Sequence, residues 1–135
     1  SHAGDYVVGV LSDCEVGCDI EKIVPAPLEI AERYFSLTEF EYIKTKCDKN
    51  RAFFTLWTLK ESYMKMTGQG MNLSLDAFEI IQTPDGFALG KSSGKSCFFR
   101  TIEFAGYIFS VSNETEFAIR QTDFYDITDF SPNVT

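Results

Sequence analysis

Hydrophobic and polar positions alternate in some segments of the chain and follow a helical period in others. Alternating or aromatic-rich runs predict strands at residues 5–11, 16–20, 77–82, 86–89, 97–104, 107–112 and 117–121. Ser12-Asp13 is a turn signal between the first two runs, so we expect them to form a hairpin. The last five runs predict an antiparallel meander. Helical patterns occupy residues 28–35, 36–46 and 50–67.

Start and stop signals support these three helices. Pro27 suits the start of the first helix, where its missing N–H is not needed. Ser36 and Glu39 form a capping-box pattern for the second, and the glycines at 68 and 70 end the third. Hairpin, helices and meander together predict an α+β fold. We expect a single domain over residues 1–135, with an antiparallel sheet covered on one face by about three helices.

Charge and hydropathy narrow the functional classes. The 12 basic and 20 acidic side chains give a net charge of −8, which argues against general nucleic-acid binding. No apolar run approaches the roughly 18 residues that span a bilayer, so no membrane partner is expected, and no signal peptide is recognisable. We therefore expect a cytoplasmic protein.

Two acids on one predicted strand are candidates for chemistry. Asp19 and Glu21 are two residues apart, so both side chains point to the same face, while Cys18 and Ile20 point to the other. One interpretation is a solvated strand face. The other is a site for a hard cation such as Mg²⁺, which binds carboxylates and keeps its remaining positions for water and phosphates.

The third predicted helix carries charge on its apolar face. With about 100° per residue, Lys60 and Glu61 fall within or beside the apolar arc, whereas Thr58, Ser62 and Lys65 fall on the polar side. Ionised groups there are costly without partners. Either Lys60 extends its head to solvent and Glu61 pairs with Lys65, or Glu61 meets Asp19 and Glu21 around a cation. In the second case both lysines reach an anionic ligand of that cation.

Taken in order, these motifs resemble a known family. Gly17-Cys18-Asp19-Ile20-Glu21, then Ser36-x-x-Glu39, then Trp57-x-x-Lys60-Glu61-Ser62, followed by two glycines, are similar to the Sfp-type 4′-phosphopantetheinyl transferases. The resemblance covers nearly the whole chain. It implies an enzyme that moves the phosphopantetheine arm of coenzyme A to a serine of an acyl or peptidyl carrier protein and releases adenosine 3′,5′-bisphosphate.

The resemblance also assigns roles to individual residues. Asp19, Glu21 and Glu61 would bind Mg²⁺, with Mn²⁺ as an alternative metal, and Lys60 and Lys65 would neutralise coenzyme A phosphates. Glu61 is in addition the candidate catalytic base. Ser1-His2-Ala3-Gly4 is similar to the family's S-H-S-G motif, which implies that His2 contacts a coenzyme A phosphate.

The length departs from the family pattern. Sfp-type enzymes are pseudo-dimers of two similar halves, and this chain corresponds to the second half only. We expect either a fragment of a longer enzyme or a homo-oligomer in which another copy completes the coenzyme A site. A non-catalytic or truncated coenzyme A-binding remnant that needs a partner half is the alternative function.

Overall fold

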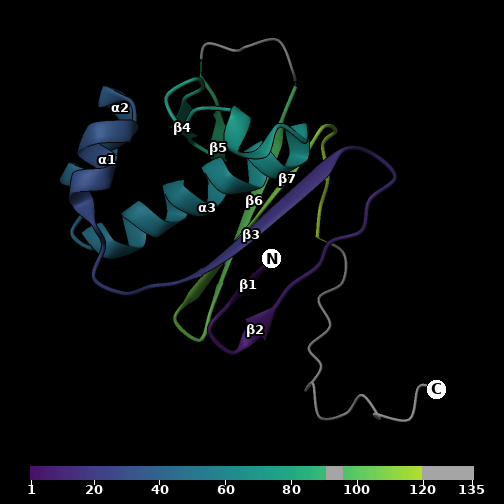
Figure 1. Ribbon diagram of the computed structural model, residues 1–135, viewed down its shortest axis with the longest axis horizontal. Coiled ribbons are helices and arrows are strands. Elements are labelled where there is room, and N and C mark those ends of the chain that lie inside the picture. Colours follow the sequence, from purple (N-terminus) through teal and green to yellow (C-terminus); the bar gives the residue numbers. More distant parts are fainter. Residues whose placement is uncertain (91–95, 120–135) are drawn as a thin grey trace.

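The computed structural model describes residues 1–90 and 96–119, and Figure 1 shows the arrangement of its elements. The helices are α1 (Leu28–Tyr34), α2 (Leu37–Thr45), α3 (Lys49–Thr67) and a short 3-10 turn, η1 (Gly70–Asn72). The strands are β1 (His2–Ala3), β2 (Tyr6–Val7), β3 (Val16–Lys22), β4 (Ile80–Thr83), β5 (Gly86–Leu89), β6 (Phe98–Phe104) and β7 (Tyr107–Asn113). All three predicted α-helices are confirmed.

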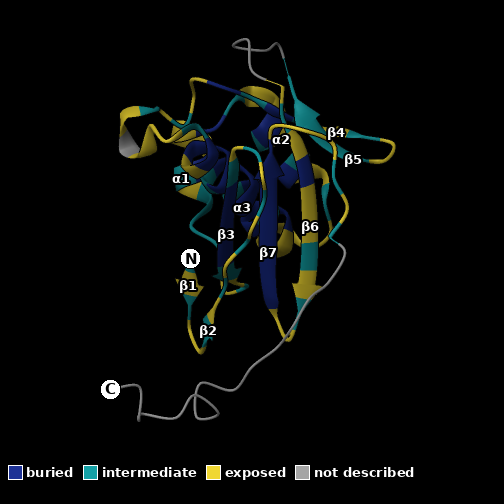
Figure 2. Ribbon diagram, turned by 90° about the vertical axis from the view of Figure 1, so that its right-hand side faces the viewer, coloured by how far each residue is buried: buried dark blue, intermediate teal, exposed yellow. Residues whose placement is uncertain are grey.

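An antiparallel sheet of three strands forms the centre of the fold, in the order β3-β7-β6. The register places Asp19 opposite Ser110 and Gly17 opposite Ser112. Strand β7 is buried along its whole length in Figure 2, because it is the central strand and both of its faces are covered. Side chains alternate, so the odd-numbered residues of β3 share one face with the even-numbered residues of β7.

Helix α3 packs on that face of the sheet at short range. The Thr58 hydroxyl lies 2.7 Å from that of Ser110, and the Ser62 hydroxyl lies 2.5 Å from that of Ser112. A Cβ added to Gly17 would overlap backbone atoms of α3, so only glycine allows this approach. The sequence prediction that Thr58 and Ser62 lie on a polar side of the helix is wrong, because the sheet buries both completely.

Helix α3 also contacts α2 and β4, and the main hydrophobic core joins these elements to Phe99 and Ile108 of the sheet. Phe53, Leu59, Ile43 and Ile80 belong to this core, together with further aromatic and aliphatic side chains from α1 and the 3-10 turn region. The capping box that starts α2 is confirmed: the Ser36 side chain accepts from the Glu39 N–H, and the Glu39 carboxylate accepts from the Ser36 N–H. Gly68 ends α3 with φ of 70°.

The amino-terminal residues cover the other face of the sheet. Tyr6, Val8 and Val10 pack there against a second apolar cluster that includes Cys18 and Ile20. The predicted hairpin of residues 5–11 with 16–20 is wrong, since β2 pairs with β1 and β3 pairs along its whole length with β7. A local turn signal at Ser12-Asp13 bends the chain, but a distant strand of matching length and pattern provides the better partner for β3.

The strands of the predicted meander belong to two different sheets rather than to one. Strands β4 and β5 form a separate two-stranded sheet, and β6 and β7 belong to the central one. Residues 117–119 form no strand, and residues 120 and 121 of the predicted last strand lie outside the described residues. The α+β class, with three helices packed on an antiparallel sheet, is nevertheless confirmed. Within the described part of the chain, no helix combines the length and apolar character that crossing a membrane would need.

Candidate functional site

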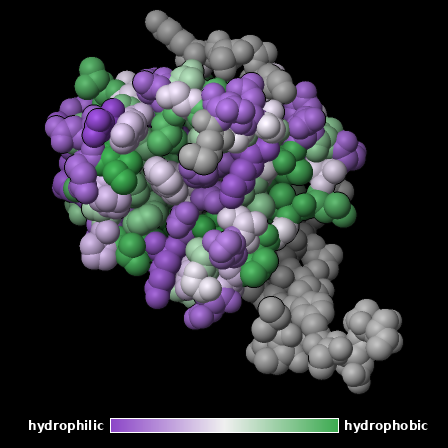
Figure 3. Space-filling model, viewed as in Figure 1, coloured by the Kyte–Doolittle hydropathy of each residue, from purple (hydrophilic) through white to green (hydrophobic). Residues whose placement is uncertain are grey.

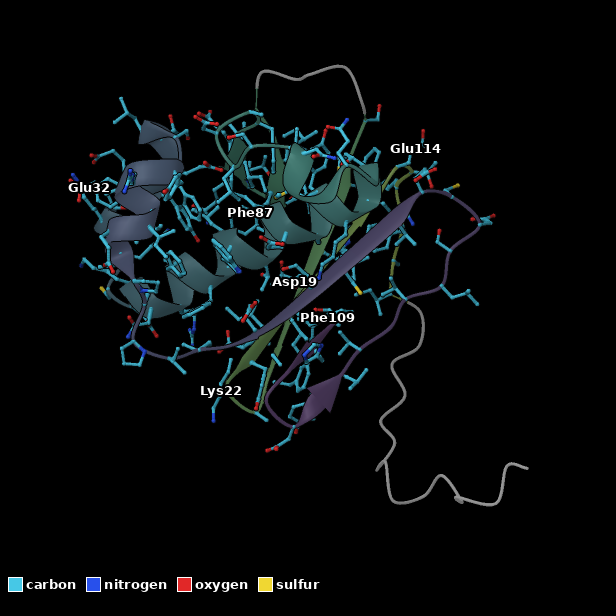
Figure 4. The ribbon with its side chains drawn as sticks, viewed as in Figure 1. Asp19, Lys22, Glu32, Phe87, Phe109 and Glu114 are labelled. Atoms are coloured by element: carbon cyan, nitrogen blue, oxygen red, sulfur yellow. The ribbon has the colours of Figure 1, made fainter. Side chains whose placement is uncertain are left out.

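Three carboxylates meet where β3 passes beside α3. Asp19 and Glu21 are on the face of β3 that is turned toward the helix, and Glu61 comes from α3 itself. Figure 4 labels Asp19 between the two ribbons. Asp19 is only 4% exposed, while Glu21 and Glu61 are half-buried. In Figure 3 a band of hydrophilic surface crosses this region of the molecule between hydrophobic patches.

Asp19 has one satisfied oxygen and one unsatisfied oxygen. Its Oδ1 accepts from the Lys65 ammonium at 2.8 Å and from the Ser1 hydroxyl at 3.0 Å. Its Oδ2 is buried and has no hydrogen-bond partner among the described residues. A buried carboxylate oxygen without a partner is costly, and such an atom in a native fold calls for an explanation.

The negative charge of Asp19 affects the pKa of each of the other two carboxyl groups. Burial, and then the negative charge of Asp19, raise the pKa of Glu21 above its ordinary value; a hydrogen bond from Trp57 and the charge of Lys65 oppose the rise. Burial and Asp19 likewise raise the pKa of Glu61, and Lys65 again opposes them. Both glutamates therefore hold their protons more firmly than free glutamate does, as expected where like charges gather.

The donor set suits a hard divalent cation, although the residues are not yet closed around one. Carboxylate oxygens are the ligands that Mg²⁺ and Mn²⁺ favour, and the partnerless Asp19 Oδ2 offers one directly. Among the described residues, however, no three acidic, histidine or cysteine side chains are already arranged to hold a metal. The described residues thus supply suitable donor atoms, and the Lys65 ammonium contacts one of them.

Lys60 is not part of this cluster. Its ammonium is completely buried and donates to both oxygens of Glu39, at 3.0 and 2.8 Å, and to the Phe78 carbonyl at 2.8 Å. The rings of Phe35 and Phe78 lie around it. Burial lowers the pKa of Lys60, and Glu39 opposes that shift. The expectation that Lys60 reaches solvent or an anionic ligand is corrected by this structure, because Glu39 and Phe78 satisfy all three of its donors.

The amino-terminal motif reaches the carboxylate cluster through Ser1 rather than through His2. The Ser1 hydroxyl contacts both Asp19 and Lys65, while His2 lies in β1 with an exposed side chain. An expected pair between Glu61 and Lys65 is not found among the described residues, since Lys65 contacts Asp19 instead. The structure thus brings together Asp19, Glu21, Glu61 and Lys65, and it leaves Lys60 outside.

Sequence reasoning missed three side chains that matter here. Glu39 was assigned only to the helix cap, although a lysine on an apolar helix face requires a buried acid nearby. Trp57 hydrogen-bonds Glu21 and lines, with Val24 and Ile30, a groove of about 340 Å³ beside that carboxylate. Its place at the edge of the apolar arc was the available signal. Ser1 carried no signal of its contact with Asp19.

Comparison with known proteins points to one family. The sequence model of the 4′-phosphopantetheinyl transferase superfamily matches residues 15–121. The chain is 43% identical over 90 residues to the 4′-phosphopantetheinyl transferase psf-1 of Bacillus pumilus. The aligned region covers 65% of this chain and 39% of that protein. The chain is 37% identical over 107 residues to the 4′-phosphopantetheinyl transferase Sfp of Bacillus subtilis, and this alignment covers 76% and 48%. The chain therefore spans at most about half the length of these relatives.

Solved structures share the fold. The Helicobacter pylori holo-[acyl-carrier-protein] synthase, solved in complex with coenzyme A, superposes with a TM-score of 0.62 at 22% identity. The match covers 73% of this chain and 97% of that one. The synthase from Neisseria meningitidis gives a TM-score of 0.63 at 12% identity, with 73% and 94% covered.

Proposed function

This chain belongs to the 4′-phosphopantetheinyl transferase superfamily, and we propose that it supplies the cation-binding half of a transferase. The reaction would move the phosphopantetheine arm of coenzyme A to a serine hydroxyl of an acyl or peptidyl carrier protein and release adenosine 3′,5′-bisphosphate. The single observation that carries the proposal is the cluster of Asp19, Glu21 and Glu61, with one buried carboxylate oxygen left without a partner.

The proposed cation ligands are Asp19, Glu21 and Glu61. Burial, and then the negative charge of Asp19, raise the pKa of both glutamates, and a divalent cation would offset the repulsion from Asp19. Bound there, Mg²⁺ or Mn²⁺ would supply positive charge to the pyrophosphate oxygens of coenzyme A. Trp57, whose hydrogen bond opposes the rise in the pKa of Glu21, lines the same groove as that carboxylate.

The remaining roles concern charge and a proton. Lys65, at the edge of the cluster, would neutralise a coenzyme A phosphate, and the exposed His2 would contact another. In the transfer, the serine oxygen forms a bond to phosphorus as the bond to the adenosine bisphosphate breaks, and the serine proton leaves. Glu61 would accept that proton, directly or through water, from its place in the carboxylate cluster.

Lys60 has a different role in this proposal. Its three hydrogen bonds to Glu39 and Phe78 tie α3 to α2 and to the chain before β4. Because Glu61 is the next residue, this buried contact fixes the helix from which Glu61 projects. Lys60 is therefore a positioning residue, rather than a ligand of coenzyme A.

A second candidate is a coenzyme A-binding protein that needs a partner half for turnover. The observation that favours it is length, since the chain spans 39% to 48% of the two Bacillus relatives described above. The missing portion could be a further segment of a longer protein or another copy of this chain. Both candidates predict cation-dependent binding of coenzyme A, and they differ in whether this chain alone transfers the arm.

The test is transfer to an apo carrier protein, followed by intact mass spectrometry of the carrier. The chain is incubated with coenzyme A and Mg²⁺, once alone and once with the amino-terminal half of the Bacillus subtilis relative supplied separately. A mass gain in either mixture supports the transferase. Metal-dependent coenzyme A binding that Asp19→Ala abolishes, with no gain in either mixture, favours the binding protein. Absence of metal-dependent binding contradicts both.

Glu61→Gln provides the sharpest variant for this assay. It removes one charge without changing volume, so we expect the fold to persist while transfer falls by at least about a hundredfold. Glu29→Gln is the matched control, because Glu29 is an exposed acid on α1, and its activity should equal that of the unaltered chain. Unfolding of the Glu61→Gln protein, seen by circular dichroism, would show that Glu61 is structural instead.

A further inference from the structure

Lys65 lies at the edge of the carboxylate cluster and contacts Asp19 directly. Its ammonium lies 2.8 Å from Asp19 Oδ1 and 3.3 Å from the Ser1 hydroxyl. Its charge also acts on Glu21 and Glu61, because it opposes the rise in the pKa of each. Of the three carboxylates, Asp19 is the one for which the described residues show direct contact with this ammonium. The second oxygen of Asp19 is left buried without a partner, so this ammonium satisfies the site only in part.

The two members of the Lys65–Asp19 pair differ in freedom. The Asp19 side chain is 6% exposed and is held on the central sheet, whereas the Lys65 side chain is 43% exposed on the last turn of α3. A lysine ammonium is a compact, strongly hydrated charge on a flexible stem, so moving into water costs it little. Lys65 can therefore leave Asp19, but Asp19 cannot follow it.

An ammonium within hydrogen-bond distance of a ligand oxygen opposes a divalent cation at that oxygen. The two positive charges would compete for Asp19 Oδ1 and would repel each other across a few ångströms.

We propose that Lys65 is a built-in counter-ion, which occupies the cation site when it is empty and is displaced from Asp19 when a divalent cation binds. The inference rests on the proposed function, because it takes Asp19 as a cation ligand. Displacement also has a consequence for the anionic ligand. The ammonium released from Asp19 becomes available to a phosphate beside the bound cation, so that cation binding prepares the site for the anion.

The test is the affinity for Mn²⁺ alone, measured by calorimetric titration of the chain without coenzyme A. Lys65→Met removes the competing charge and keeps the length of the stem, so we expect Mn²⁺ to bind roughly three- to tenfold more tightly. Lys65→Arg keeps the charge and should bind Mn²⁺ as the unaltered chain does. Asp19→Asn removes the ligand and should weaken binding by at least about tenfold.

Lys22→Met is the matched control for general electrostatics. Lys22 follows Glu21 on β3, but its side chain is on the other face of the sheet, where its ammonium lies 6.0 Å from the centre of the Tyr107 ring. The Lys22→Met substitution removes one positive charge from the strand that carries Asp19 and leaves the contacts of Asp19 unchanged. Only a gain in Mn²⁺ affinity for Lys65→Met that exceeds the gain for Lys22→Met supports displacement.

The outcomes separate this inference from the proposed function. If Asp19→Asn loses Mn²⁺ and Lys65→Met binds it no more tightly than Lys22→Met, the metal site stands and the counter-ion role is overturned. If Asp19→Asn binds Mn²⁺ as the unaltered chain does, both proposals are overturned. Tighter binding by Lys65→Met together with loss in Asp19→Asn supports both.

Discussion

Helix α3 carries two lysine–carboxylate pairs that differ in completeness. Lys60 and Glu39 are both fully buried, and every donor of the ammonium has an acceptor. The Glu39 oxygens also accept from the N–H groups of Ser36 and Ile80, so neither partner has unused capacity. Lys65 and Asp19 form a half-exposed pair in which one aspartate oxygen has no partner.

The difference indicates what each pair does. A saturated, buried pair leaves no donor or acceptor for a ligand, and it fixes α2, α3 and the start of β4 relative to one another. The unsaturated pair has one buried member, which retains a free acceptor oxygen, and one partly exposed lysine that can move. On the same helix, therefore, the chemically complete pair is structural and the incomplete one is the candidate site.

The largest expected effect comes from breaking the complete pair. Lys60→Met leaves the Glu39 charge buried without its counter-charge, so we expect it to lower the free energy of unfolding by about 3–5 kcal/mol. Lys65→Met, the matched substitution in the incomplete pair, should lower it by less than Lys60→Met does, since the Lys65 side chain is 43% exposed and Asp19 keeps the hydrogen bond from the Ser1 hydroxyl. Urea denaturation measures both values.

The double variant Glu39→Gln with Lys60→Met sharpens this result. Removing both charges avoids the isolated buried charge, so the double variant should be more stable than Lys60→Met alone. If Lys60→Met costs no more than Lys65→Met, the distinction between the two pairs fails.

A smaller effect on stability is expected from moving β3, the strand that carries Asp19. Gly17→Ala places a Cβ against the backbone of Ser62 and Met66, so β3 has to move away from α3 near Asp19. We expect a loss of about 1–3 kcal/mol in stability. Mn²⁺ binding should weaken as well, because Asp19 is two residues farther along β3.

Gly9→Ala is the control for Gly17→Ala, since a Cβ there would meet no atom within 4 Å. Denaturation and Mn²⁺ titration of both variants separate a steric effect at the helix from a general effect of losing glycine. Equal stability and equal affinity in the two variants would show that the close approach of β3 to α3 is unimportant.

The smallest expected effect is the pH dependence of the stability that Glu21 and Glu61 contribute, beside the incomplete Lys65–Asp19 pair. The pKa values of Glu21 and Glu61 are raised in the folded chain above the ordinary 4.5, so the folded state binds protons more firmly than the unfolded state. Stability from these groups is therefore present at low pH and is lost as the pH rises from about 4.5 through the raised values. Differential scanning fluorimetry in the presence of a chelator should show the melting temperature of the unaltered chain falling over this range relative to that of Glu61→Gln.

Glu61→Gln should flatten this pH profile, because it removes one titrating group and lowers the repulsion on the other. The exposed Glu29→Gln should leave the profile unchanged. A difference in melting temperature between the unaltered chain and Glu61→Gln that stays constant through this pH range would contradict the raised pKa values.

Much of the local structure could be read from the sequence, since its causes lie within a few residues. The capping box of Ser36 and Glu39 and the left-handed Gly68 depend on neighbours three or four positions away. The shared face of Asp19 and Glu21 follows from strand alternation alone. The order of the motifs was enough to indicate the family.

The partners of these residues were decided by the tertiary structure. Lys60 finds Glu39 across 21 positions of sequence and Lys65 finds Asp19 across 46, while β3 pairs with a strand near the other end of the chain. A helical wheel treats Thr58 and Ser62 as polar-side residues, and only the packed sheet shows that their hydroxyls are buried against Ser110 and Ser112. Periodicity determines the direction of a side chain from its own element. What lies in that direction depends on how distant elements pack.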